Sequence, residues 1–270
     1  MVVGSIELLS VRDAVGVLAE LGNAYPEVPA EAWEPYRALY PELFSGDGWR
    51  VPCNCFLVRS DGMTILVDTG VGPPGLWDWT AEHEGDLPEA LTELGVARDG
   101  VDLVFLTHLH IDHVGWNTDL EGVALFPRAR YVVHRDALEF ARTQDGRPHV
   151  QRCIVSIADR FEQVSGDVEL AAGVTAFAAP GHYPGHMGLR LESAGQTAVL
   201  LADTAVHPAL LHEPDWPYVS DGDPSLCSET RQALLPELVD RDVVVACGHY
   251  PGSGIGRILR RNDRVVWEAV

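Results

Sequence analysis

The chain of 270 residues carries 19 basic and 40 acidic side chains, which gives a net charge of −21. This acidic balance argues against nucleic acid or an anionic membrane as a partner. Hydrophobic residues make up 46% of the chain, enough for a sizeable core. No apolar run reaches the roughly 18 residues that a membrane-spanning helix needs. The N-terminus lacks the basic start and long apolar run of a signal peptide, so we expect a cytoplasmic protein.

The first part of the chain combines an apolar segment with an irregular aromatic one. Residues 6–17 predict one or two strands, interrupted near Asp13. Residues 22–48 are rich in proline, tryptophan and tyrosine and contain at most a short helix, around 30–39. A segment of this composition could form a flap over a substrate pocket or simply pack on the surface, and the sequence favours neither.

A hairpin signal follows, with strands at 53–58 and 64–68 joined by a Ser-Asp-Gly turn. Cys53 and Cys55 begin the first strand. They could form a metal hook, but their spacing of two inside an apolar run is more simply explained by the strand. Because the five cysteines are scattered and no secretion signal precedes them, a disulfide framework is not expected. The second strand ends at Asp68, whose carboxylate could orient ligand imidazoles from behind or cap the next turn.

The rest of the chain alternates helical and strand-like segments. Helical spacing is present at 87–94, 135–143, about 150–159 and 226–239. Strands are expected at 101–106, 131–134, 161–164, 168–170, 174–178, 188–191, 197–201 and 243–247, with final strands near 258 and 265–267. This order is typical of two similar sheet-plus-helix halves packed together.

The stretch THLHIDHVGW, residues 107–116, directly follows the buried strand at 101–106. It offers His108, His110, Asp112 and His113 within six positions. Neutral imidazoles and carboxylates are ligands of zinc and similar first-row metals. In open α/β sheets the chemistry collects just beyond the carboxyl ends of strands, so the position of this motif indicates a site.

Three later segments place further ligand types at strand ends. Residues 179–188, APGHYPGHMG, offer His182 and His186, and two other strands lead to Asp203 and His249. The total is enough for two metal ions. We expect one ion to be held by His108, His110 and His186, the other by Asp112, His113 and His249, with Asp203 bridging them. His182 is then a structural residue that ties down its loop. The all-nitrogen and oxygen donor set favours zinc, and iron, manganese or cobalt would also fit.

This series resembles the metal-binding series of the metallo-β-lactamase fold superfamily over about residues 53–254. The resemblance implies an α/β fold over residues 1–270, a four-layer αβ/βα sandwich of two mixed β-sheets with helices on the outer faces. It also implies metals at one edge, with Asp68 near them. The motif THLHIDHVGWN is most similar to that of quorum-quenching N-acyl-homoserine lactonases and methyl-parathion-hydrolase-like enzymes. Lactonases of this kind carry a tyrosine three residues after the bridging aspartate, where this chain has Val206.

We therefore expect a dinuclear metal hydrolase in which a hydroxide between two divalent ions attacks a small, partly apolar ester or lactone. Asp112 could also carry a proton to the leaving group. The substrate pocket is expected from Trp33, Tyr36, Trp77, Trp79, Trp116, Val206 and His207. A glyoxalase-II-like thioester hydrolase, a phosphotriester hydrolase, an iron-dependent redox enzyme and a non-catalytic metal-binding domain are the alternatives. The charge speaks against a transfer-RNA-processing nuclease, and both a monomer and a homodimer are compatible with the sequence.

Overall fold

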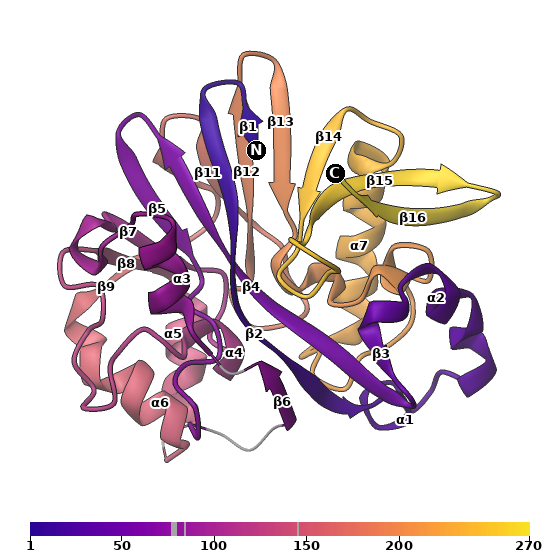
Figure 1. Cartoon of the computed structure of the whole chain (residues 1–270), viewed down its shortest axis with the longest axis horizontal. Coiled ribbons are helices and arrows are strands. Elements are labelled where there is room, and N and C mark those ends of the chain that lie inside the picture. Colours follow the sequence, from indigo (N-terminus) through magenta and orange to yellow (C-terminus); the bar gives the residue numbers. More distant parts are fainter. Residues whose placement is uncertain (77–79, 84, 145) are drawn as a thin grey trace.

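The computed structural model describes residues 1–76, 80–83, 85–144 and 146–270. Two β-sheets stand face to face in the middle of the molecule, and helices cover their outer sides (Figure 1). The expected four-layer αβ/βα sandwich is thereby confirmed. The expected pocket residues Trp77 and Trp79 lie outside the described residues.

The first sheet has nine strands among the described residues and is formed by the N-terminal part of the chain. Its long β2 and β4 pair antiparallel, whereas β5, β7, β8 and β9 run parallel to one another. In spatial order its strands are β1 (Val2–Val3), β2 (Ile6–Glu20), β4 (Gly48–Ser60), β5 (Met63–Val67), β7 (Leu103–Leu106), β8 (Arg130–His134) and β9 (Phe161–Val164), with β3 (Phe44–Ser45) on β4 and β6 (Thr80–His83) on β2.

The second sheet has seven strands in the described part of the chain. All neighbours are antiparallel except β13 and β14, which run parallel. Its order is β10 (Val168–Ala171), β11 (Val174–Ala178), β12 (Met187–Ser193), β13 (Gln196–Leu200), β14 (Val243–Ala246), β15 (Ile255–Arg261) and β16 (Arg264–Ala269).

Helices form the outer layers. Helices α3 (Leu87–Glu93), α5 (Arg135–Thr143) and α6 (Pro148–Cys153) lie beside the first sheet, and α7 (Pro224–Leu238) lies behind the second (Figure 1). Short pieces complete the set: α1 (Leu21–Ala24), α2 (Glu34–Leu39), α4 (Ile111–Val114) and 3₁₀ turns at Ala30–Trp33, Pro41–Leu43, Arg98–Gly100, Val155–Arg160, Ala202–Ala205 and Pro208–Leu211. None of the helices in the described ranges is long and apolar enough to cross a membrane.

The space between the sheets is filled by alternate residues of each strand. On β4, Phe56 and Val58 pack in the inter-sheet cluster with Leu189 of β12, whereas Cys55 and Leu57 pack in a separate cluster with the helices of the first sheet. Successive side chains of a strand point to opposite faces, so one strand contributes to both cores. Fully burying one such large apolar side chain is worth about 1.5–3 kcal/mol.

The aromatic segment at 22–48 is part of the core. Trp33 is 1% exposed, and its ring lies 4.9 Å from the rings of both Tyr25 and Trp216. His207 packs edge-on against Trp33 at 5.1 Å. Aromatic pairs at these separations stabilise a core by about 0.5–1.5 kcal/mol each beyond the burial of their area. The segment thus anchors the lower right of Figure 1 to the second sheet's outer face.

Asp13 is a buried carboxylate that holds the loop after β5. It accepts hydrogen bonds from the backbone N–H groups of Val71 and Leu87 and from Nε1 of Trp116, at 2.6, 2.8 and 2.9 Å. Burial raises the pKa of Asp13 to about 6, although the three hydrogen bonds oppose this shift. One carboxylate therefore fastens the backbone at Val71 and at Leu87 to Trp116, which ends the histidine motif.

The variant Asp13→Asn should lower the free energy of unfolding by about 1–3 kcal/mol, because its amide NH₂ must face N–H donors where the carboxylate accepted. Urea unfolding at fixed metal content measures this. The control is Asp47→Asn, whose side chain is 93% exposed and which should change stability by less than about 0.5 kcal/mol. Equal stability of the two variants would contradict the role given to Asp13.

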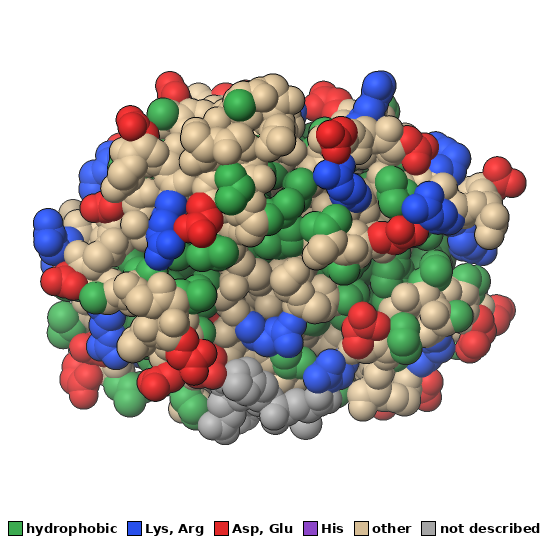
Figure 2. Space-filling view, turned by 45° about the horizontal axis from the view of Figure 1, so that its top comes forward, with side chains coloured by type: hydrophobic (Ala, Val, Ile, Leu, Met, Phe, Trp, Pro, Cys, Tyr) green, Lys and Arg blue, Asp and Glu red, His purple; other side chains and the backbone are tan. Residues whose placement is uncertain are grey.

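Charges on the surface are mixed by sign. On the face shown in Figure 2, acidic and basic side chains are interspersed, with apolar side chains between them in the middle. Basic side chains on this face do not gather into the broad stripe that a nucleic-acid-binding surface presents.

Candidate metal centre

The expected ligands come from four segments that leave strands at one edge of the two sheets. Strand β7 ends at Leu106 and leads into His108 and His110, after which α4 carries Asp112 and His113. The loop from β11 to β12, the turn after β13 and the turn after β14 supply the remaining groups. Strands β5 and β7 are parallel, as are β13 and β14, so the carboxyl ends in each sheet lie at one edge. Contacts of His110 with His182 and of His113 with Asp203 join the two edges.

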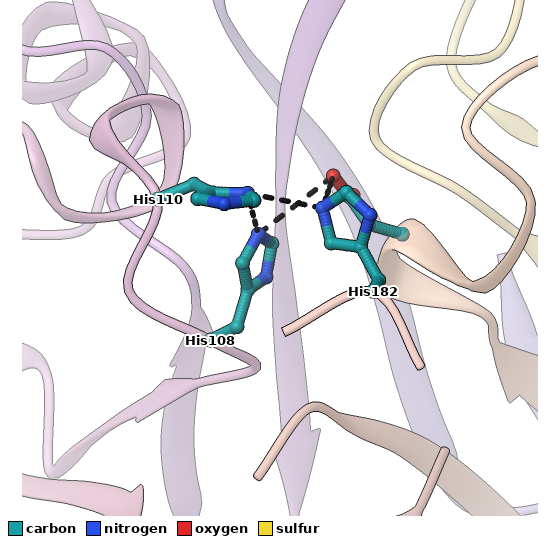
Figure 3. A group of neighbouring side chains, drawn as sticks. His108, His110 and His182 are labelled. Atoms are coloured by element: carbon teal, nitrogen blue, oxygen red, sulfur yellow. Dashed lines mark hydrogen bonds and ion pairs between the residues drawn. The ribbon is translucent and has the colours of Figure 1, made fainter. Parts of the chain in front are cut away.

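The first cluster consists of three imidazoles and one carboxylate. His110 Nδ1 lies 3.0 Å from His108 Nε2 and 3.0 Å from His182 Nε2. Oδ2 of Asp203 lies 3.7 Å from His108 Nε2 and 3.2 Å from His182 Nε2. The three labelled rings in Figure 3 point toward one another, His108 and His110 from the loop after β7 and His182 from the loop between β11 and β12. Four donor atoms at such mutual distances are what a tetrahedral zinc site requires.

The second cluster lies on the other side of the same carboxylate. Oδ1 of Asp203 is 3.4 Å from His113 Nε2 and 3.3 Å from His249 Nε2. Oδ2 of Asp112 is 3.5 Å from His249 Nε2 and 3.8 Å from His113 Nε2. Each oxygen of Asp203 thus faces its own group of imidazoles, which is the arrangement of a carboxylate that bridges two cations.

The structure exchanges the roles expected for His182 and His186. His186 donates from Nδ1 to the carbonyl of Ala179 at 2.6 Å and accepts at Nε2 from the backbone N–H of Asp203 at 3.0 Å. Both ring nitrogens are occupied, so His186 supports the backbone of Asp203. His182, expected to be structural, points into the first cluster. The assignment of His186 to that cluster is wrong.

The β11–β12 connection explains the exchange. His186 immediately precedes β12, and its carbonyl accepts from the N–H of Ala179, so its backbone continues the β11–β12 pairing. His182 lies nearer the tip, where Gly222 N–H donates to its carbonyl. A Cβ on Gly181 would lie 2.5 Å from the backbone nitrogen of Cys227. Only glycine therefore allows this loop to approach the start of α7.

Asp68 orients the imidazole of His113 through a hydrogen bond, which is the first of the two roles that the sequence suggested for this carboxylate. Its Oδ2 accepts from His113 Nδ1 at 2.8 Å, and its Oδ1 accepts from the backbone N–H of Thr107 at 2.8 Å. Asp68 has a φ of 60°, a left-handed conformation that non-glycine residues rarely adopt. Sparsely populated backbone conformations of this kind cluster at functional sites.

A buried ion pair behind His182 escaped the sequence analysis. Oδ1 of Asp221 accepts from His182 Nδ1 at 2.8 Å, and its Oδ2 lies 2.9 Å from Nη2 of Arg231. Nε of Arg231 also donates to the carbonyl of Thr204 at 2.7 Å. Arg231 therefore connects the support of His182 to the turn that carries Asp203. The pair lies far along the chain from the histidine motif, and no local pattern marks either residue.

Replacing this support should weaken metal binding without removing a donor. Asp221→Asn is expected to lower the affinity of the first cluster for zinc by about 10–100-fold, because the amide cannot fix the His182 tautomer and pair with Arg231 together. Competition with a chelator of known zinc affinity measures the change. Asp47→Asn is the matched control, and the same affinity in both variants would contradict the proposed support.

The residues present fit two divalent cations. Nε2 of His113 and Oδ1 of Asp203 are buried side-chain atoms without a hydrogen-bond partner, and both face the second cluster. Burial lowers the pKa values of His108 and His110, which keeps these imidazoles neutral and able to donate lone pairs. Although burial opposes it, the charges of His249 and His113 hold the pKa of Asp203 well below its usual range. A buried carboxylate beside the neutral imidazoles of His108 and His110 offers the donor types that a divalent cation accepts.

Metal binding at the second cluster should depend on pH. Although burial opposes the shift, Asp203 raises the pKa values of His113 and His249 well above the ordinary value, so both hold protons near neutrality when no cation is bound. An incoming ion must displace these protons, and its apparent affinity should rise with pH by up to about tenfold per unit for each proton displaced. Zinc competition titrations across about pH 6–8 measure the slope, and a flat profile would contradict the charge assignment.

A cavity of about 160 Å³ opens onto both clusters. One group of its lining residues is apolar: Leu18, Trp49, Val51 and Val206. A second group carries polar or charged atoms: Gln144, Arg147, His149, Tyr218 and Ser220. Asp112, His110, His182, Asp203 and His249 also line it. The cavity therefore joins the candidate metal centre to a partly apolar pocket, the mixture of side chains that small-molecule sites present.

Only Val206 of the described expected pocket residues lines this cavity. Trp33 and Tyr36 pack in the core on the outer side of the second sheet, and the ring of His207 packs edge-on against Trp33. Tyr36 donates to Glu213 at 2.9 Å. Trp116 donates to Asp13 and does not reach the cavity. The prediction that these four residues line the pocket is wrong, because their rings pack against the core clusters instead of facing the cavity.

Comparison with known proteins agrees with the fold and with a metal-binding site. The sequence pattern of the metallo-beta-lactamase superfamily matches residues 48–249. The chain is 27% identical to the N-acyl homoserine lactonase of Bacillus thuringiensis over 221 residues, which cover 77% of this chain and 84% of that protein. It is 28% identical over 189 residues to N-acyl homoserine lactonase AiiB of Agrobacterium fabrum, with 61% of this chain and 66% of that protein covered.

Solved structures agree on the fold. AidC, a dizinc quorum-quenching lactonase solved with a product N-hexnoyl-L-homoserine, superposes with a TM-score of 0.87 at 21% identity, covering 100% of this chain and 96% of that one. The hydrolase AbOPH of the beta lactamase superfamily superposes with a TM-score of 0.84 at 23% identity and the same coverage. The matched sequence pattern covers most of the chain, and the chain belongs to the metallo-beta-lactamase superfamily of metal-dependent hydrolases.

Proposed function

We propose that the protein is a dinuclear metal-dependent hydrolase of a small, partly apolar lactone or ester, with N-acyl homoserine lactones as the first class to test. The observation that carries this proposal is the position of Asp203, whose two oxygens face two separate groups of imidazoles. The lactonase relatives among the comparisons suggest the class of bond.

The donor set defines two positions. His108, His110 and His182 would hold one ion, Asp112, His113 and His249 the other, and Asp203 would touch both. Two divalent ions at such positions supply Lewis acidity, which polarises a carbonyl oxygen and acidifies water. Zinc leads because imidazole and carboxylate suit it, and a relative of the same fold is a dizinc enzyme.

Residues that line the pocket would bind the acyl chain of the substrate and move a proton to the leaving group. Leu18, Val51 and Val206 offer an apolar wall that would accept an acyl chain. Asp112 is only half-buried and lines the cavity, so its carboxylate is placed to take up a proton and pass it to the leaving oxygen. Val206 cannot donate a hydrogen bond to the lactone oxygen. The phenol of Tyr218, which lines the same cavity, is the nearest substitute in chemical type.

The test is a substrate panel run on protein of measured metal content. The panel holds N-acyl homoserine lactones of several chain lengths, a simple γ-lactone, an aryl ester, a phosphotriester and a thioester. We expect the acylated lactones to give the highest kcat/KM, with turnover lost on chelation and restored by zinc.

Two outcomes of this panel would change the conclusion. Turnover confined to the phosphotriester or the thioester would move the function to those bonds. A chain with two ions bound that turns over none of the panel would contradict the hydrolase proposal for these substrates and favour a non-catalytic metal-binding domain.

A further inference from the structure

Cys53 lies at the edge of the second cluster, on β4 rather than on any of the segments that carry the expected ligands. One ligand atom each of Cys53, Asp112 and His249 lie within 4.8 Å of one another. The thiol is 4% exposed and sits on a long central strand, where Cys53 pairs with Ala14 of β2. Its position is therefore rigid.

These separations are close to what one ion can span. Zinc–nitrogen and zinc–sulfur bonds are about 2.0–2.3 Å long, so two ligand atoms of a tetrahedral zinc ion lie about 3.3–3.6 Å apart. Nε2 of His113 and Oδ1 of Asp203 are buried, have no hydrogen-bond partner and face the same second cluster, so both are available as further donors to a cation there.

We propose that Cys53 is a thiolate ligand of the ion that Asp112, His113, Asp203 and His249 would hold. The proposal rests on the dinuclear centre proposed above. On coordination the S–H bond breaks, the proton leaves to solvent water, and the sulfur lone pair donates to the cation. No electron is transferred, so no oxidant or reductant is needed.

The thiolate makes the two positions chemically unequal. The first is formed by three imidazoles and one shared carboxylate, whereas the second gains a soft sulfur donor and one more negative charge. Soft thiolate ligands select zinc over manganese or magnesium. We therefore expect manganese to be retained less well at the second position than at the first.

The other cysteines near the site lack this arrangement. Cys55 stands two residues along β4 and packs among Val11, Leu57 and Leu66 in the helix-facing cluster. Cys247 directs Sγ at the carbonyl oxygen of Ala202, 3.3 Å away. Neither belongs to a metal-competent group among the described residues. Cys55 is therefore a matched control on the same strand.

Cobalt(II) substitution tests the assignment. The wild-type chain, Cys53→Ser and Cys55→Ser are each loaded with two equivalents of cobalt(II), and their absorption spectra are recorded. We expect visible ligand-field bands in all three. The near-ultraviolet sulfur-to-cobalt charge-transfer band should appear in the wild type and in Cys55→Ser and be lost in Cys53→Ser.

The outcomes separate this inference from the proposed function. Visible bands without a charge-transfer band in the wild type would overturn the thiolate and leave the dinuclear centre standing. Absence of any cobalt binding would overturn both. If Cys53→Ser does not fold, zinc X-ray absorption on the wild type decides: a sulfur shell at about 2.3 Å with one sulfur per two zinc ions supports the ligand, and a spectrum without sulfur overturns it.

Discussion

Asp203→Asn should lower kcat/KM for the best substrate of the panel by at least about 1,000-fold, equivalent to about 4 kcal/mol of transition-state stabilisation. The amide has nearly the shape of the carboxylate but no charge, and both groups of imidazoles lose their shared anion. Bound zinc should fall from two ions per chain to fewer than one. Elemental analysis after gel filtration measures the metal, and initial rates measure the activity.

The control for this variant is Asp47→Asn, which removes an exposed carboxylate paired with Arg37 and should keep two ions and full activity. Retention of two ions and of activity within tenfold in Asp203→Asn would contradict a bridging role. Circular dichroism accompanies both variants, so that a loss of fold is distinguished from a loss of metal.

His182→Gln should lose bound metal and activity, whereas His186→Gln should keep most of both. His182→Gln removes a donor of the first cluster, so we expect loss of about one ion and a fall in kcat/KM of at least about 100-fold. In His186→Gln the amide can still accept from the N–H of Asp203 and donate to Ala179. Two ions should remain, with activity within about tenfold of the wild type.

Each glutamine variant serves as the control for the other, since the two substitutions are chemically identical and four residues apart. Metal content and kcat/KM of both are measured under the same loading conditions. If His186→Gln lost an ion and His182→Gln kept both, the ligand order expected from the sequence would be restored and the geometry described here would be wrong.

Most elements follow from local patterns in the sequence. The hairpin of β4 and β5, the helices α3 and α5 and the strand before the histidine motif lie within a few residues of their predicted positions. The interruption expected near Asp13 is absent, because β2 runs unbroken from Ile6 to Glu20. The β2–β4 ladder instead shifts register between Arg12 and Ala14 and between Val17 and Ala19. Such bulges allow an extra residue to leave the ladder without ending the strand.

The candidate site was predictable in its residue types and only partly in its geometry. Spacing alone cannot distinguish His182 from His186, because the choice depends on where the β11–β12 ladder stops. Asp221 and Arg231 act through contacts between distant segments, for which the sequence has no periodic signal. Cys53 was explained by its strand alone, and its nearness to His249 arises only when β4 and the turn after β14 meet.

The most direct measurement is anomalous diffraction at the zinc edge from crystals of zinc-loaded protein. We expect two peaks about 3.5–4 Å apart, one among His108, His110 and His182 and the other among Asp112, His113 and His249, with Asp203 between them. A single peak, or two peaks on the same side of Asp203, would contradict a dinuclear centre built by these residues.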